Sequence, residues 1–161
     1  MDLERITNEV EALSLEVGRF IMNEWDQLST ENIEAKGLND FVTYVDTTSE
    51  KQLVKGLKEI VPEAGFLVDP LDGTTNYIHG IQPFSISVAL EKDQKIVLGL
   101  VIEPGINDIF KAWQDGPAFL NGSEIHVSKT PSLDQSLIST GFPYKDFERV
   151  ESYLKLLRHF M

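Results

Sequence analysis

The stretch DPLDGTTNY, residues 69–77, places two carboxylates and a turn within nine positions. The apolar residues 66–68 before it predict the end of a buried strand, with Asp69 emerging at its carboxyl end, where open sheets bind ligands. Pro70 is expected to end the strand because it has no N–H to donate. Asp72 and Gly73 are typical turn residues. The sequence therefore predicts that two carboxylates point into one small volume.

Two carboxylates held this close repel each other, and a protein normally tolerates them only with a cation between them or a proton on one of them. Mg²⁺ prefers oxygen ligands, keeps several waters and is often completed by a substrate phosphate. Asp69 and Asp72, with the backbone carbonyl of Leu71 between them, therefore form a predicted magnesium site.

The residues after the carboxylates predict an anion site. Gly73, Thr74 and Thr75 can begin a helical turn. The first N–H groups of such a turn have no partner within it and attract phosphate. Gly73 and Thr74 are therefore candidate phosphate-binding residues, directly beside the metal site.

Simpler interpretations exist for several of these residues. Asp-Pro followed by Asp-Gly is common in surface turns, although Thr-Thr-Asn after an apolar strand favours the metal site. Asp46 can belong to a helix start, since Thr47 and Glu50 fit a capping box, and both roles can hold at once. Lys36 is interpreted as a solvated lysine. The two histidines His79 and His126 are interpreted as structural, because neither lies in a ligand-spaced cluster.

Five segments in the same order carry a resemblance to a known family. They are KGLNDFVTYVDTTSE (36–50), DPLDGTTNY (69–77), HGIQPFSISVAL (79–90), GLVIEPGINDIFKAW (99–113) and GPAFLNGSEIHVSKT (116–130). The chain resembles the inositol monophosphatase family, a branch of the magnesium-dependent, lithium-sensitive phosphatases that includes fructose bisphosphatases. The match extends from about Lys36 to the end, so no single short pattern carries it.

The resemblance implies direct attack of water on a phosphate monoester. Magnesium would be held by Asp69, the Leu71 carbonyl and Asp72. Asp46 matches the family aspartate that helps to activate the water, with the Thr74 hydroxyl as intermediary. Backbone N–H groups of Gly73 and Thr74 would hold the phosphate.

The substrate expected from the resemblance is inositol monophosphate. Thr-Asn-Tyr at 75–77 is similar to the inositol and histidinol phosphate branch, whereas the nucleotide 3′-phosphatase branch tends to have Lys-Glu there. Histidinol phosphate or another sugar phosphate is the alternative. A second alternative is a non-catalytic regulatory binding protein of the same fold, because some relatives act partly by binding the transcription machinery.

Composition narrows the choice of partners and location. The 26 acidic and 14 basic residues give a net charge of −12, which argues against direct nucleic-acid binding. No apolar run reaches membrane-spanning length and residues 1–10 do not have the layout of a signal peptide, so a cytoplasmic protein without membrane contact is expected. The absence of cysteine leaves oxygen or imidazole as metal ligands. The resemblance implies a homodimer.

Hydrophobic periodicity predicts the α+β class, with helices on a mostly antiparallel sheet in one domain. The expected elements are a helix from residue 3 to about 25, a strand at 41–45, a helix ending near Pro62, a β-hairpin of 84–90 with 95–102, strands at 108–113 and 118–120, another strand after residue 121, and a helix after Phe142. The resemblance implies a layered α/β sandwich.

The chain departs from the family pattern at two places. Between Pro62 and Asp69 the family carries a longer passage with a metal-binding Glu-Glu pair, and about 20 residues are absent here, more than ordinary loop trimming. After Met161 the family continues with a second sheet layer and a further metal-binding aspartate. Residues 1–161 are therefore expected to be one incomplete phosphatase domain without its C-terminal layer. Such a chain should expose apolar surface and bind magnesium poorly.

Overall fold

The computed structural model describes residues 1–25, 27, 33–37, 40–142 and 147–160. Its first half contains α1 (Leu3–Trp25), β1 (Ile33–Gly37), β2 (Asp40–Thr43), α2 (Tyr44–Ile60), β3 (Gly65–Asp72) and α3 (Thr74–Ile78). Its second half contains β4 (Ser85–Lys92), β5 (Lys95–Glu103), β6 (Asp108–Trp113), β7 (Ala118–Leu120), β8 (Ser123–Ile125), the 3₁₀ turns η2 (Leu133–Gln135) and η3 (Phe147–Arg149), and α4 (Val150–Phe160).

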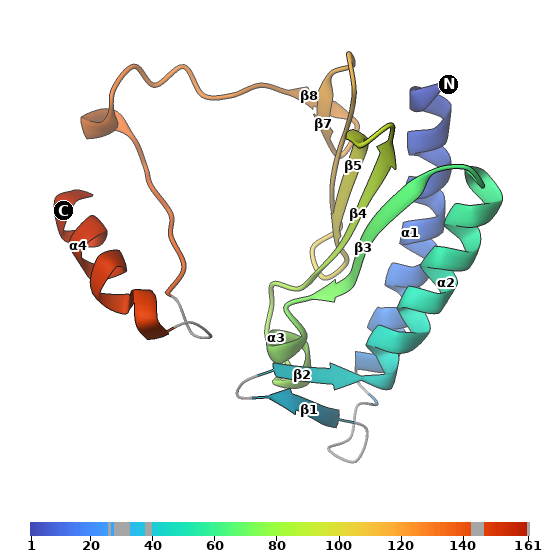
Figure 1. Ribbon diagram of the computed structural model, residues 1–161, viewed down its shortest axis with the longest axis horizontal. Coiled ribbons are helices and arrows are strands. Elements are labelled where there is room, and N and C mark those ends of the chain that lie inside the picture. The colour runs from blue at the N-terminus through green and yellow to red at the C-terminus, as the bar shows by residue number, and fades with distance from the viewer. Residues whose placement is uncertain (26, 28–32, 38–39, 143–146, 161) are drawn as a thin grey trace.

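Six strands form one antiparallel sheet in the order β3-β4-β5-β6-β7-β8, and β1 pairs with β2 in a separate antiparallel ribbon. Helices α1 and α2 lie side by side on one face of the large sheet (Figure 1). Alternate residues of β4 and β5 are buried against them: Ile86, Val88, Leu90, Leu98, Leu100 and Ile102. The α+β prediction of helices on an antiparallel sheet is confirmed.

The predicted hairpin is confirmed as β4 and β5, which pair from Ile86 with Ile102 to Lys92 with Lys95. Asp93 and Gln94 form the two-residue turn with φ values of 52° and 62°. Positive φ at both positions matches the right-handed twist of the two strands.

The expectation that β3 is buried and ends at Pro70 is wrong. Its residues alternate between more and less exposed positions, and Leu67 is 55% exposed. The strand continues to Asp72, with an irregularity between Asp69 and Asp72 in its pairing with β4. Because β3 lies at the edge of the sheet, Pro70 can occupy the irregularity without breaking a second ladder.

The predicted strand at 41–45 ends earlier, at Thr43, and α2 begins at Tyr44. Thr43 has extended backbone angles, and its hydroxyl accepts hydrogen bonds from the N–H groups of Val45 and Asp46. The capping box therefore joins Thr43 and Asp46, and the predicted box of Thr47 and Glu50 is wrong.

The described chain from residue 126 onward extends away from the layers formed by α1, α2 and the sheet (Figure 1). Figure 1 shows residues 126–142 as a long connection to α4, which stands apart from the sheet. No residue of α4 is buried. The face of the sheet opposite α1 and α2 exposes Val101, Phe110 and Ile125. None of the described helices is long and apolar enough to cross a membrane.

Candidate functional site

The first turns of two helices meet at Asp46 and Thr74. Asp46 lies in the first turn of α2, and Thr74 begins α3. The Thr74 hydroxyl donates to Asp46 Oδ1 at 2.9 Å, across 28 residues of sequence. The structure thus brings the two predicted catalytic residues into direct contact.

The Thr74 hydroxyl has a second acceptor, since its Oγ1 lies 2.9 Å from the carbonyl oxygen of Leu71. A hydroxyl has one proton and two lone pairs, and neither a carbonyl nor a carboxylate can donate to it. The single proton of Thr74 is therefore shared between the Leu71 carbonyl oxygen and Asp46 Oδ1, and the lone pairs of Thr74 remain able to accept a proton from another molecule.

The three predicted metal-binding residues lie at the end of β3, in the irregular part of its pairing. Asp69 pairs with Ser87 and Asp72 pairs with Ser85. Asp69 and Asp72 are exposed, whereas the side chain of Leu71 is buried and its N–H donates to Asp69 Oδ1 at 3.3 Å. The irregularity therefore places both aspartates at the surface on either side of a residue anchored in the core.

The electrostatic surroundings of Asp69 disfavour its charged form. Partial burial raises the pKa of Asp69 above its ordinary value, and the negative charges of Asp72 and Asp46 raise it further. The hydrogen bond from the Leu71 N–H acts in the opposite direction. A cation would relieve the repulsion that remains.

The three candidate metal ligands are of the kind that Mg²⁺ prefers. Asp69, Asp72 and the Leu71 carbonyl supply oxygen ligands only. Burial raises the pKa of Asp69 and the charges of Asp72 and Asp46 raise it further, so the residues suit a hard cation that keeps several waters. Within the described part of the chain, no three His, Cys, Asp or Glu side chains group closely enough to hold a metal by themselves. The side chain of Lys36 lies outside the described residues, although its backbone belongs to β1.

Gly73 is the N-cap of α3, so the predicted helical turn is present. Its φ of 91° is in the left-handed region. A Cβ at this position would lie 3.1 Å from the Pro83 carbonyl oxygen and 3.3 Å from the Phe84 Cα. The close approach of the segment before β4 therefore requires glycine here. Phosphate binding by Gly73 and Thr74 remains a prediction.

The rings of Trp25, Tyr77 and Phe84 form an aromatic cluster that holds α3 against the end of α1. Trp25 and Tyr77 each pack edge-on against Phe84, with centroid distances of 5.0 and 5.2 Å. The Trp25 indole N–H donates to the Tyr77 carbonyl at 3.1 Å, and the Tyr77 hydroxyl donates to the Ile21 carbonyl at 2.9 Å. Burial raises the pKa of Tyr77 well above its usual range, with Glu24 and Asp46 adding to the effect, so this hydroxyl remains a donor.

Sequence reasoning missed three residues that support the site: Thr43, Trp25 and Tyr77. The Thr-x-x-Asp spacing of Thr43 and Asp46 was a usable signal for the cap. No pattern in the sequence links Trp25 to Tyr77, since 52 residues separate them.

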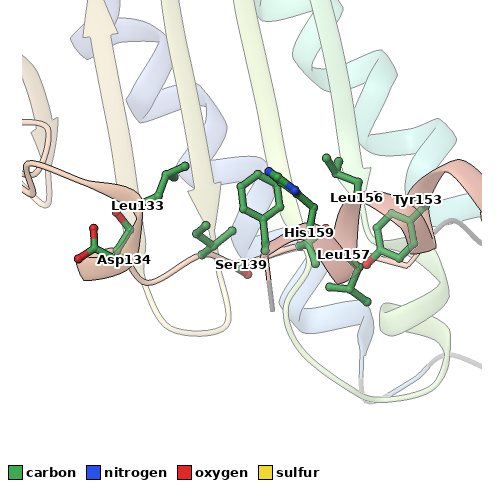
Figure 2. A pocket seen from close by; sticks show the side chains of 11 residues that line it. Leu133, Asp134, Ser139, Tyr153, Leu156, Leu157 and His159 are labelled. Carbon is green, nitrogen blue, oxygen red and sulfur yellow. The ribbon is translucent and has the colours of Figure 1, made fainter.

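The histidines and the largest pocket among those described lie elsewhere. His79 is exposed, and His126 Nε2 lies 3.5 Å from Glu124 Oε1 at the surface. Figure 2 shows a pocket between the segment around Leu133 and α4, lined by Tyr153 and Leu157 among others. None of the predicted catalytic, metal-binding or phosphate-binding residues lines this pocket.

Comparison with known proteins supports the family resemblance. A model described as "Inositol monophosphatase family" matches residues 63–159. The chain is 35% identical to the "Putative Nus factor SuhB" of Neisseria meningitidis serogroup B, covering 89% of this chain and 62% of that protein. It is 33% identical to the "Inositol-1-monophosphatase" of Rhizobium meliloti, covering 89% of this chain and 60% of that protein.

Solved structures agree with the described fold. The extragenic suppressor protein SuhB of Bartonella henselae superposes with a TM-score of 0.87 at 30% identity, over 98% of this chain and 66% of that one. The Thermotoga maritima IMPase superposes with a TM-score of 0.72 at 30% identity, over 81% of this chain and 56% of that one. The chain thus spans about three fifths of the length of the curated relatives it matches.

Proposed function

The chain belongs to the inositol monophosphatase family, and we propose on this basis that the whole protein hydrolyses a small phosphate monoester with magnesium. The observation that carries the proposal is the 2.9 Å contact between Thr74 Oγ1 and Asp46 Oδ1. This contact joins Asp46, the predicted base, to the Thr74 hydroxyl, which would lie between Asp46 and the attacking water. The pair lies directly beside the predicted metal ligands.

Asp69, Asp72 and the Leu71 carbonyl would hold the ion. Magnesium supplies polarisation of a phosphate oxygen and a lower pKa for a water that it binds. The backbone N–H groups of Gly73 and Thr74 would hold phosphate oxygens at the start of α3, where the turn lies close against Pro83 and Phe84.

Thr74 and Asp46 would remove the proton from the attacking water. The Thr74 oxygen accepts a proton from the attacking water while its own proton passes to Asp46 Oδ1. The second contact, from Thr74 to the Leu71 carbonyl, keeps the hydroxyl oriented next to a predicted metal ligand. Hydrolysis then requires no covalent intermediate on the protein.

The test is steady-state hydrolysis of inositol 1-phosphate by the full-length protein, with and without magnesium. Activity should require magnesium, stop with EDTA and be inhibited by millimolar lithium. Thr74→Val and Asp46→Asn should each reduce kcat by about 100-fold or more, as general acid–base groups do. Thr47→Val is the matched control, because the Thr47 hydroxyl donates only to the Tyr44 carbonyl on the exposed side of α2. Wild-type activity in Thr74→Val would contradict the proposal.

Inositol monophosphate is the proposed substrate, and histidinol phosphate or another sugar phosphate is the alternative. A Rhizobium meliloti relative is named an inositol-1-monophosphatase, and a Thermotoga maritima relative at 32% identity is named a fructose-1,6-bisphosphatase/inositol-1-monophosphatase. Comparing kcat/KM for inositol 1-phosphate, histidinol phosphate and fructose 1,6-bisphosphate decides among them.

A regulatory role is the second candidate, favoured by a relative named "Putative Nus factor SuhB" at 35% identity and one named "Nus factor SuhB" at 32% identity. In that case the protein would bind a component of the transcription machinery without hydrolysis, and Asp46→Asn would leave its binding unchanged. We also propose a cytoplasmic homodimer, supported by the family resemblance. Light scattering of the full-length protein tests the dimer, and cell fractionation tests the location.

A further inference from the structure

Thr43, which caps α2, also contacts the side chain of Asp46. We propose that Thr43 is a positioning residue for the reaction, because it holds the Asp46 carboxylate in the one orientation that presents Oδ1 to Thr74. The inference rests on the proposed function and adds Thr43 to the residues that act in it.

Both oxygens of Asp46 are occupied, and by different partners. Oδ2 accepts two hydrogen bonds from Thr43, one from the backbone N–H at 2.8 Å and one from the hydroxyl at 2.6 Å. Oδ1 accepts from the Thr74 hydroxyl at 2.9 Å. Because a carboxylate is planar, fixing Oδ2 between two donors of one residue also fixes the direction of Oδ1.

The hydroxyl of Thr43 can donate only to Asp46. Its oxygen accepts from the N–H groups of Val45 at 3.2 Å and Asp46 at 3.3 Å, so its lone pairs face the helix backbone. Its single proton is then directed to Asp46 Oδ2. Thr43 is 2% exposed, so little water competes for this proton.

The capping box and the proposed proton path therefore share one carboxylate. In an ordinary cap, the side chain at the third helical position serves the helix alone. Here Oδ1 of Asp46 takes no part in the capping box and accepts a hydrogen bond from Thr74 in α3. Loss of the Thr43 hydroxyl leaves the carboxylate with the N–H as its one donor in the box, and Oδ1 is then free to turn away from Thr74.

The two possible roles of Thr43 predict different kinetics. A residue that only caps α2 lowers the melting temperature when it is changed, and kcat measured well below that temperature stays the same. A positioning residue lowers kcat, by about 10- to 100-fold as for groups that orient a reacting residue. KM should stay within about 2-fold, because the proposed phosphate contacts come from the backbone of Gly73 and Thr74 and not from Asp46.

The experiment compares Thr43→Val, Thr43→Ser and Thr47→Val in the full-length protein. Valine keeps the shape of threonine and removes the hydroxyl, whereas serine keeps the hydroxyl. Thr47→Val removes a hydroxyl one turn further along α2 that does not contact Asp46. We expect kcat to fall in Thr43→Val, to lie within about 3-fold of the wild-type value in Thr43→Ser, and to equal the wild-type value in Thr47→Val. Thr43→Ala repeats the measurement if valine crowds the site.

Two further readouts separate positioning from capping. The double variant Thr43→Val/Thr74→Val should be no slower than Thr74→Val alone, because both changes break one path and their effects do not add. A crystal structure of Thr43→Val should show that Asp46 Oδ1 has left the Thr74 hydroxyl. Wild-type kcat with a lower melting temperature, or a retained 2.9 Å contact in that crystal structure, overturns the inference.

Failure of the inference and failure of the proposed function give different results. If the wild-type protein hydrolyses no phosphate monoester, the proposed function fails, and the crystal structure still shows whether Thr43 orients Asp46. If the wild-type protein is active and Thr43→Val keeps its kcat, the inference alone fails.

Discussion

Asp69 is a surface residue whose carboxylate is partly desolvated beside Asp72, at the end of the edge strand β3. Neither aspartate has a basic partner among the ion pairs that the structure describes. At the scale of single residues, the site therefore holds negative charge that stabilises the protein only when a cation is present.

We expect Asp72→Asn to reduce turnover far more than it reduces folding stability. The change keeps the shape and removes the charge of a proposed ligand, so the loss of kcat should exceed the roughly 10- to 100-fold typical of outer-shell partners. The free energy of unfolding should change by only about 0.5 kcal/mol, because Asp72 is exposed. Asp93→Asn, the same change at the far end of β4, is the control. Equal losses of turnover and stability would count against a metal role for Asp72.

We expect Asp69→Asn to raise the melting temperature in EDTA at pH 7. The folded state raises the pKa of Asp69, so it binds this proton more tightly than the unfolded state. The contribution of Asp69 to stability is therefore fully present below the ordinary pKa of 3.8 and is lost as pH rises through its folded-state pKa. The gain in Asp69→Asn should disappear below about pH 4, and magnesium should stabilise the wild type more than the variant. A variant less stable than wild type at pH 7 in EDTA would refute this account.

At the scale of elements, α3 is a short helix held from two sides. Tyr77 and Trp25 fix it to α1, and the Asn76 side-chain amide donates to the Pro83 carbonyl at 2.7 Å. Gly73 fits closely against the segment before β4. The position of Thr74 thus depends on contacts that lie outside α3.

We expect Gly73→Ala to destabilise the protein by more than Gly122→Ala. Both glycines have positive φ, 91° and 78°, so an alanine at either position has a conformational cost of about 1–2 kcal/mol. The Cβ of residue 73 would also meet the Pro83 carbonyl at 3.1 Å, whereas no atom lies within 4 Å at residue 122. Denaturant unfolding of both variants gives the difference. Equal destabilisation would mean that the Pro83 segment moves aside easily.

The sequence predicted the elements of the site better than their contacts. The hairpin of β4 and β5 and the turn at Gly73 follow from local patterns of apolar and turn residues, and both are present. The start of α2 was misplaced because Thr47 and Glu50 match the usual capping pattern, whereas the observed box has aspartate in place of glutamate. The contact of Asp46 with Thr74 spans 28 residues; the family resemblance implied it, whereas helical or strand periodicity carries no information on residues so far apart in the sequence.

At the scale of the whole molecule, the described chain has two parts of very different packing. One contains α1, α2 and the sheet, with a continuous buried core, and the other contains residues 126–142 and α4, where no residue is buried. Relatives that match this chain are longer by about two fifths of their own length. Apolar residues of α4 and of the open sheet face remain exposed in the chain as described.

We expect the rates of amide hydrogen exchange in the 161-residue chain to differ between these two parts. Amides of α4 should exchange within minutes, because opening this helix uncovers no core. Amides of β4 and β5 should be the slowest. Helix α1 is the internal control, since it is also a helix but buries Ile6, Val10, Val17 and Ile21. Protection of α4 equal to that of α1 would show that α4 packs more tightly than its exposure indicates.

Because Trp25 packs against Tyr77 and Phe84, its intrinsic fluorescence can report on the state of the site. The chain has two tryptophans, and the second, Trp113, stacks on Phe119 where β6 pairs with β7. In Trp113→Phe, all indole emission comes from a ring that donates a hydrogen bond to α3. Emission that changes when inorganic phosphate and magnesium are added together, and not when either is added alone, would reveal occupancy of the Gly73–Thr74 turn in real time and without turnover.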